Sequence, residues 1–248
     1  MKHTSAELKR LSREQLNGHW GIAIGANLLM QLITSALLMP FYFLFILSGG
    51  RMVQYITYMV ATFIIAAVSI VIQCGILRIY FGFARGEEIS IGMMFSEFSR
   101  RPFRYMLGYL LLMFIEMVCI IPGTICFSVG LVGGTFLAIA IGAALYLVGM
   151  VIMLIVALRF SQVFLILLEH GEMGVMEAFH RSAELMEGNM GRFFYIELSF
   201  IGWALLGLLS CGIGMLWVTP YMMQVSVNFY RSLTGELDEV ENYADVGR

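Results

Sequence analysis

Long apolar runs alternate with short polar connections along this chain. Six runs have the length, roughly 17 residues or more, that a helix needs to cross the hydrocarbon core of a bilayer. Short connections after the first, third and fifth runs pair them into three helical hairpins. The pattern predicts an all-α polytopic membrane protein, with one membrane domain over 1–248 and spans at 20–47, 53–77, 103–121, 135–158, 193–210 and 214–230.

Short amphipathic segments precede each hairpin. Residues 1–19 are polar, and Thr4 and Glu7 have the spacing of a helix capping box. This start predicts an amphipathic helix at the headgroup level, with a plain solvated helix as the alternative, and it does not have the pattern of a cleavable signal. Segments 91–98 and 175–186 are expected to be further interfacial helices on the cytoplasmic side.

Positive charge is distributed very unequally. All but one of the 15 Lys and Arg residues lie in the N-terminal segment, in or at the edge of two of the connections between runs, or after the last run, and Arg51 is the exception. Because cytoplasmic loops carry an excess of Lys and Arg, both termini are expected in the cytoplasm, in a multi-pass protein of the plasma membrane. Residues 236–248 then form an acidic cytoplasmic tail, expected to be solvated.

The three hairpins also resemble one another. The second helix of each runs through aromatic and Arg residues to a Gly-Glu pair, at 86–87, 171–172 and 235–236. This favours three copies of a unit made of an interfacial helix and a hairpin, as in transporters with internal repeats. Independent use of the same membrane-interface residues is the alternative.

Composition excludes several classes of protein. Apolar residues make up 60% and charged residues 13% of the chain, against ~45–50% and ~25% in soluble domains, and the mean hydropathy is +0.85. A water-soluble globule of this size cannot cover so much apolar surface, and disordered chains are polar. With 15 Lys and Arg against 17 Asp and Glu, no nucleic-acid partner is expected.

Few ionisable groups fall inside the predicted spans. Glu116 lies near the middle of the third, with no charged residue within one helical turn. Such groups are costly in hydrocarbon and are functional candidates by default. Asn27 and Gln31 of the first span and Gln73 of the second are its candidate partners, and these four residues form the predicted intramembrane polar site. A helix-packing hydrogen bond is the alternative role for Glu116.

No motif for catalysis or cofactor binding was found. The sequence contains no HExxH, P-loop, GxSxG or GxGxxG, so no catalytic residue, cofactor or metal is expected and the chain is not expected to be an enzyme. Cys74, Cys119, Cys126 and Cys211 have neither CxxC spacing nor accompanying His. They are expected to be small packing residues, and a disulfide among the last three is left open.

Several segments resemble a known family. The start at 7–21 (ELKRLSREQLNGHWG) and the segments 182–189, 198–203 and 219–221 with 229–230 are similar to a bacterial membrane family catalogued as domain of unknown function 975. The resemblance extends over nearly the whole chain and implies a six-span protein of the cytoplasmic membrane. It implies no established activity, so it assigns no functional residue.

Two functions follow as hypotheses. The first is a non-catalytic scaffold or accessory subunit whose partners are the lipid bilayer and other membrane proteins or further copies of itself. The alternative is a small-solute transporter or lipid-handling protein with its site around Glu116. The two are distinguished by whether Glu116, Asn27, Gln31 and Gln73 converge on one cavity.

Overall fold

A computed structural model describes residues 3–238, and within that range the regular elements are all helical. Two long hairpins pair α2 (Trp20–Leu47) with α3 (Met52–Arg85) and α4 (Pro102–Gly133) with α5 (Phe136–Arg159). The shorter elements are α1 (Ser5–Leu16), the 3-10 helix η1 (Ile91–Ser99), α6 (Val163–Glu169), α7 (Val175–Met186), α8 (Met190–Leu198), α9 (Ile201–Leu209) and α10 (Met215–Thr234). The predicted all-α class is confirmed.

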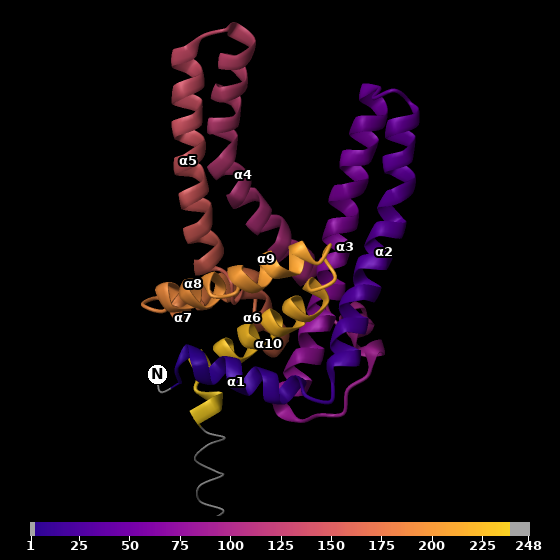
Figure 1. Ribbon diagram of the computed structural model, residues 1–248, viewed down its shortest axis with the longest axis vertical. Coiled ribbons are helices and arrows are strands. Elements are labelled where there is room, and N and C mark those ends of the chain that lie inside the picture. The colour runs from indigo at the N-terminus through magenta and orange to yellow at the C-terminus, as the bar shows by residue number, and fades with distance from the viewer. Residues whose placement is uncertain (1–2, 239–248) are drawn as a thin grey trace, which may run out of the picture.

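The two hairpins stand upright on a base made by the shorter helices (Figure 1). Helices α8, α9 and α10 lie across this base instead of standing beside the hairpins (Figure 1). The ends of the described chain meet there, with 3.0 Å between His3 Nε2 and Asp238 Oδ1. Both ends therefore lie on the same side of the four upright helices. The predicted tail lies outside the described residues from 239 onward.

The prediction of six spans is not confirmed. Five helical segments of the described chain are long and apolar enough to cross a membrane: Trp20–Leu47, Met52–Arg85, Pro102–Gly133, Phe136–Glu169 and Met190–Leu209. The predicted sixth span, 214–230, falls in α10 and is not among them. Helix α10 is not apolar enough because it carries polar side chains. Two of them, Gln224 and Asn228, each donate a hydrogen bond to Gln15 Oε1 of α1, both at 2.7 Å. Helix α10 is thus packed against protein in the base.

Three other predicted spans differ from the helices in their bounds. The second was expected to end at 77, yet α3 continues to Arg85. The third was expected to end at 121, yet α4 continues through Pro122 to Gly133 and ends where Gly134 takes a positive φ of 64°. A proline is tolerated inside a membrane helix because its surroundings satisfy the freed carbonyl. The fifth, 193–210, is divided into α8 and α9 at Ser199 and Phe200.

Two of the three predicted amphipathic segments form the α-helices α1 and α7, and the segment 91–98 forms the 3-10 helix η1. Thr4 and Glu7 form the expected capping box, with Thr4 N donating to Glu7 Oε2 at 2.6 Å and Glu7 N donating to Thr4 Oγ1 at 3.3 Å. Helices α1 and α7 both have 12 residues. Each is followed by a short turn with a positive-φ glycine, Gly18 or Gly188, and then by the next helix. This match supports a repeat between the first and third units.

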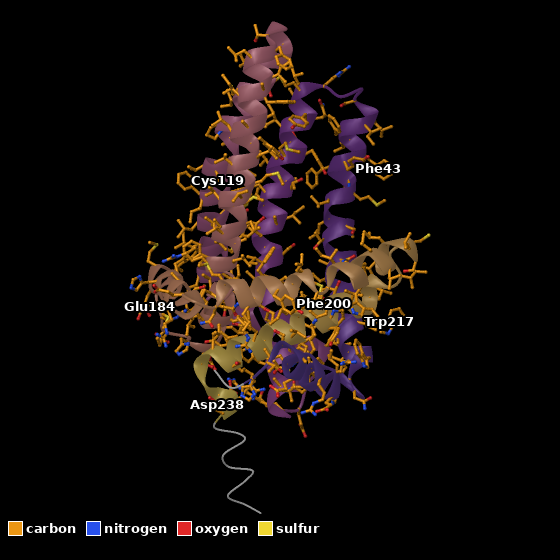
Figure 2. The ribbon with its side chains drawn as sticks, turned by 60° about the vertical axis from the view of Figure 1, so that its left-hand side comes forward. Phe43, Cys119, Glu184, Phe200, Trp217 and Asp238 are labelled. Carbon is orange, nitrogen blue, oxygen red and sulfur yellow. The ribbon has the colours of Figure 1, made fainter. Side chains whose placement is uncertain are left out.

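The buried core lies in the base. Its fully buried side chains include Leu16 of α1, Ile76 of α3, Met94 of η1 and Leu167 of α6. The upper parts of the hairpins instead expose large apolar side chains, such as Val132 at 92%. Figure 2 shows these side chains pointing outward along the hairpins, above the base. The protein therefore has a packed base and two hairpins whose apolar surface the described chain leaves uncovered.

Glycines let the α4–α5 hairpin close tightly. A Cβ added at Gly142 would lie 2.3 Å from Phe127 N, and one at Gly123 would lie 2.5 Å from Tyr146 N. Both positions therefore place one helix backbone directly against the other. In lipid, where apolar side chains gain little by leaving the solvent, such close packing is a main source of helix association.

We expect Gly142→Ala to destabilise the α4–α5 hairpin by about 1–3 kcal/mol, because the new methyl group overlaps backbone atoms that cannot move independently. Gly21→Ala is the matched control, since that glycine is also helical and a Cβ there meets nothing within 4 Å. Thermal unfolding of the detergent-solubilised protein measures both. Equal stability of the two variants would show that the hairpin is not closed by its glycines.

Candidate functional site

Two of the four predicted polar residues have their own partners. Asn27 Nδ2 donates to the Tyr80 hydroxyl at 2.7 Å, which joins α2 to α3. Gln73 Nε2 of α3 lies 3.6 Å from Met223 Sδ of α10. Both contacts link neighbouring helices, as interhelical hydrogen bonds do in membrane proteins.

The other two residues lie apart from these contacts. Gln31 is exposed on α2, and Glu116 is half-buried on α4. Within the described chain, neither carries a side-chain hydrogen bond or ion pair to another residue of the predicted site. The structure therefore brings none of these four side chains into hydrogen-bond contact with another.

The most buried carboxylate of the described chain lies in the base, on η1. Glu97 is fully buried, and its two oxygens accept from Arg78 Nε of α3 and from the Tyr105 hydroxyl of α4, both at 2.6 Å. The backbone of η1 lies directly against α3 because α3 has a glycine at the point of contact. A Cβ added at Gly75 would lie 2.1 Å from Met94 O. Glu97 thus holds three elements together through charge-assisted hydrogen bonds.

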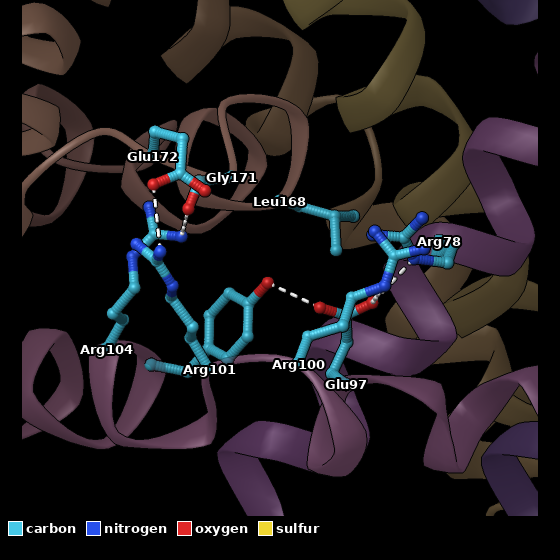
Figure 3. A pocket seen from close by; sticks show the side chains of 9 residues that line it. Arg78, Glu97, Arg100, Arg101, Arg104, Leu168, Gly171 and Glu172 are labelled. Carbon is cyan, nitrogen blue, oxygen red and sulfur yellow. Dashed lines mark hydrogen bonds and ion pairs between the residues drawn. The ribbon is translucent and has the colours of Figure 1, made fainter.

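Beside Glu97 is a pocket of about 270 Å³ (Figure 3), which we call the arginine pocket. Its lining includes the guanidinium groups of Arg78, Arg100, Arg101 and Arg104. Arg101 pairs with Glu172 at 2.8 Å. The first turn of α4 and the α6–α7 connection thus form opposite walls of the pocket.

Arg104 is held by backbone carbonyls. Its Nη2 donates to His170 O at 2.9 Å and to Met173 O at 2.6 Å, and Nη1 donates to Gly171 O. Its Nε is buried without a hydrogen-bond partner in the described chain. Because those partners are neutral carbonyls, the positive charge of Arg104 is not neutralised by them.

The arginine pocket carries excess positive charge. Four guanidinium groups face two carboxylates, those of Glu97 and Glu172, so the lining has a formal charge of plus two. Guanidinium groups bind carboxylates and phosphates through paired hydrogen bonds. The pocket can therefore hold an anion, and among the described residues no group of His, Cys, Asp and Glu is arranged to hold a metal ion.

A second ionic cluster, the end cluster, joins the ends of three helices. Arg85 at the end of α3 lies 2.5 Å from Glu169 of α6 and 2.9 Å from Glu236, which follows α10. Glu236 also pairs with Arg231 at 3.1 Å, and the Tyr230 hydroxyl donates to Glu169 at 2.6 Å. Residues near the three predicted Gly-Glu pairs thus meet in space.

The pKa of the Glu236 carboxyl is lowered in the fold. Burial by itself would raise this pKa, but the hydrogen bonds and positive charges of Arg85 and Arg231 outweigh that effect. Glu236 is therefore held in its charged form by the two arginines.

Sequence reasoning missed the role of Glu97. From the sequence, the segment 91–98 is predicted only as an interfacial helix, and the arginines at 100–104 contribute only to the predicted topology. A single Glu in an otherwise apolar segment, next to an Arg cluster, was the available signal. The four cysteines are free, so the disulfide left open among Cys119, Cys126 and Cys211 does not form in this structure.

Comparison with known proteins gives one match. The model of a family described as "Protein of unknown function (DUF975)" matches residues 1–236. Neither the curated proteins nor the solved structures give a match.

We expect Glu97→Gln to destabilise the fold by about 3 kcal/mol, since breaking a buried ion pair leaves Arg78 without its counter-charge. Glu172→Gln is the control, because this carboxylate also lines the arginine pocket but is 86% exposed and should contribute under about 1 kcal/mol. Thermal unfolding in detergent compares them. A small effect for Glu97→Gln, equal to that of the control, would contradict the anchoring role.

The end cluster should weaken in acid. Because the folded pKa of Glu236 lies below its ordinary value of 4.5, its contribution is complete above that value and is lost as the pH falls through the folded pKa. Hydrogen exchange at the end of α10, corrected for intrinsic rates, should therefore accelerate between about pH 5 and pH 3. Glu236→Gln should show the faster exchange at both pH 5 and pH 3. Glu87→Gln is the control, because Glu87 belongs to the Gly-Glu pair at 86–87 and is exposed, and it should behave as the unchanged protein.

Proposed function

This chain belongs to the DUF975 family, and from that premise we propose that it is a non-catalytic scaffold or accessory subunit of the plasma membrane, acting through contacts with membrane proteins, further copies of itself, or lipids. The uncovered surface of the hairpins carries this proposal. In the most apolar stretch of 18 residues in α2, no residue is buried inside the protein, and in the corresponding stretch of α4 only 6% of the residues are buried. Such surface is available to helices of a partner.

The few buried positions of the upper hairpins support the same function. In α5 the buried residues are Gly142 and Gly149, both at the seam with α4. Beyond that seam, α5 presents large apolar side chains such as Leu147, which is 63% exposed. Small residues at helix interfaces and apolar side chains on the outside are typical of hairpins that associate within a membrane.

The distribution of charge supports a cytoplasmic base. The arginine pocket and the end cluster both lie in the base, whereas Arg51 lies at the turn between α2 and α3, at the far end of that hairpin. By the positive-inside rule, this distribution supports a cytoplasmic location of the base and of both termini. A transporter or lipid-handling protein built around Glu116 has less support, because within the described chain no hydrogen bond joins any two of the four predicted side chains.

Photocrosslinking in the native membrane tests the proposal. A benzophenone amino acid replaces Phe114 of α4 or Leu147 of α5, which are 65% and 63% exposed. The same group at His180, which is 81% exposed on α7 in the base, is the control. We expect a discrete protein adduct from the hairpin positions and none from His180. An adduct of twice the chain mass would identify a second copy as the partner.

Native mass spectrometry of the gently extracted protein supplies the contradicting outcome. A bare monomer without protein adducts, together with a stoichiometric solute that disappears in Glu116→Gln, would overturn the scaffold function. That result would support the transport or lipid-handling alternative. An assembly that is unchanged in Glu116→Gln would instead assign that carboxyl to packing.

A further inference from the structure

The tryptophans of this protein gather in one groove. The chain contains 3 tryptophans, and Trp20, Trp203 and Trp217 all line a groove of about 320 Å³, which we call the tryptophan groove. It is formed by α1, the start of α2, α9 and α10, and its lining also includes Phe200 and Tyr221. Figure 2 shows Phe200 and Trp217 where the base meets the upright hairpins.

The groove has an apolar end and a charged end. Trp203 and Trp217 are 59% and 49% exposed, and the other large exposed side chains of α9, such as Leu205 and Leu206, are apolar. At the other end, Lys9 Nζ lies 4.8 Å from the centre of the Phe200 ring, and the Arg13 guanidinium lies 6.0 Å from that of Tyr221. Both cations come from one face of α1.

The two cations have no counter-charge within the described chain. Lys9 Nζ donates to the Ser199 hydroxyl, a neutral group, and the groove lining contains no carboxylate. Burial and the nearby positive charge of Arg13 together lower the pKa of the Lys9 ammonium, because both disfavour its charged form. The arginine pocket and the end cluster, by contrast, each contain two carboxylates.

We propose that the tryptophan groove binds an anionic phospholipid, with an acyl chain against the tryptophans and the phosphate between Lys9 and Arg13. Tryptophan side chains favour the headgroup level of a bilayer, where their rings contact both apolar and polar parts of a lipid. Basic side chains at that level attract anionic headgroups. This site names one specific lipid where the proposed function names lipid contacts in general, and it does not depend on a partner protein, since the groove is formed within one chain.

Fluorescence quenching tests the site directly, because every tryptophan lines the groove. The purified protein is reconstituted in phosphatidylcholine vesicles, and either brominated phosphatidylglycerol or brominated phosphatidylcholine is added as a minor component. We expect the anionic lipid to quench preferentially, by about fivefold in apparent affinity for each cation. Lys9→Gln with Arg13→Gln should abolish that preference.

Two controls separate charge at the groove from charge on the helix. Arg10→Gln removes the same charge from the same helix, but Arg10 is 74% exposed and pairs with Glu14, so the preference should remain. Lys9→Arg with Arg13→Lys keeps both charges and should also preserve it. Equal quenching by the two lipids in the unchanged protein, or an unchanged preference in the double Gln variant, would overturn the proposal. Displacement of the lipid by millimolar inorganic phosphate would also overturn it, by showing a site for the free anion.

Discussion

The buried carboxylate of Glu97 is the interaction on which the arrangement of the two hairpins depends. It lies between Arg78 of α3 and Tyr105 of α4, at 2.6 Å from each, so it links the second helix of one hairpin to the first helix of the next. A charge without solvent is costly unless it is paired and fully hydrogen-bonded. The three elements that meet at Glu97 are therefore constrained to stay together, and the walls of the arginine pocket are built on them.

The rest of the base is assembled by similar polar contacts. Gln15 of α1 accepts from both Gln224 and Asn228 of α10, and Glu236 holds the ends of α3 and α10 through Arg85 and Arg231. Such groups would be costly in hydrocarbon but are satisfied where helices pack against one another at its edge. This explains why the third hairpin, which carries several of them, lies across the base while the first two stand upright.

The division into a polar base and apolar hairpins also separates two kinds of interaction. The hairpins, closed internally by glycines such as Gly123 and Gly142, expose the apolar helical surface on which the proposed contacts with partners depend. The base carries positive charge in the arginine pocket and in the tryptophan groove. A membrane scaffold that also recognises anionic lipid would use both parts at once, each in the medium that its side chains favour.

The sequence by itself determined the helical class, the four long helices α2 to α5 except for the ends of α3 and α4, and the amphipathic helices α1 and α7. Hydrophobic periodicity, run length and capping residues are local signals, so they can be read without knowing the fold. The tertiary structure alone decided that α10 packs in the base and that Asn27 pairs with Tyr80. It also decided that Glu97, and not Glu116, is the carboxylate that is fully buried and paired with an arginine. These outcomes depend on which helices meet, because a polar side chain has the same appearance in a sequence whether it faces lipid, a partner helix or a buried arginine.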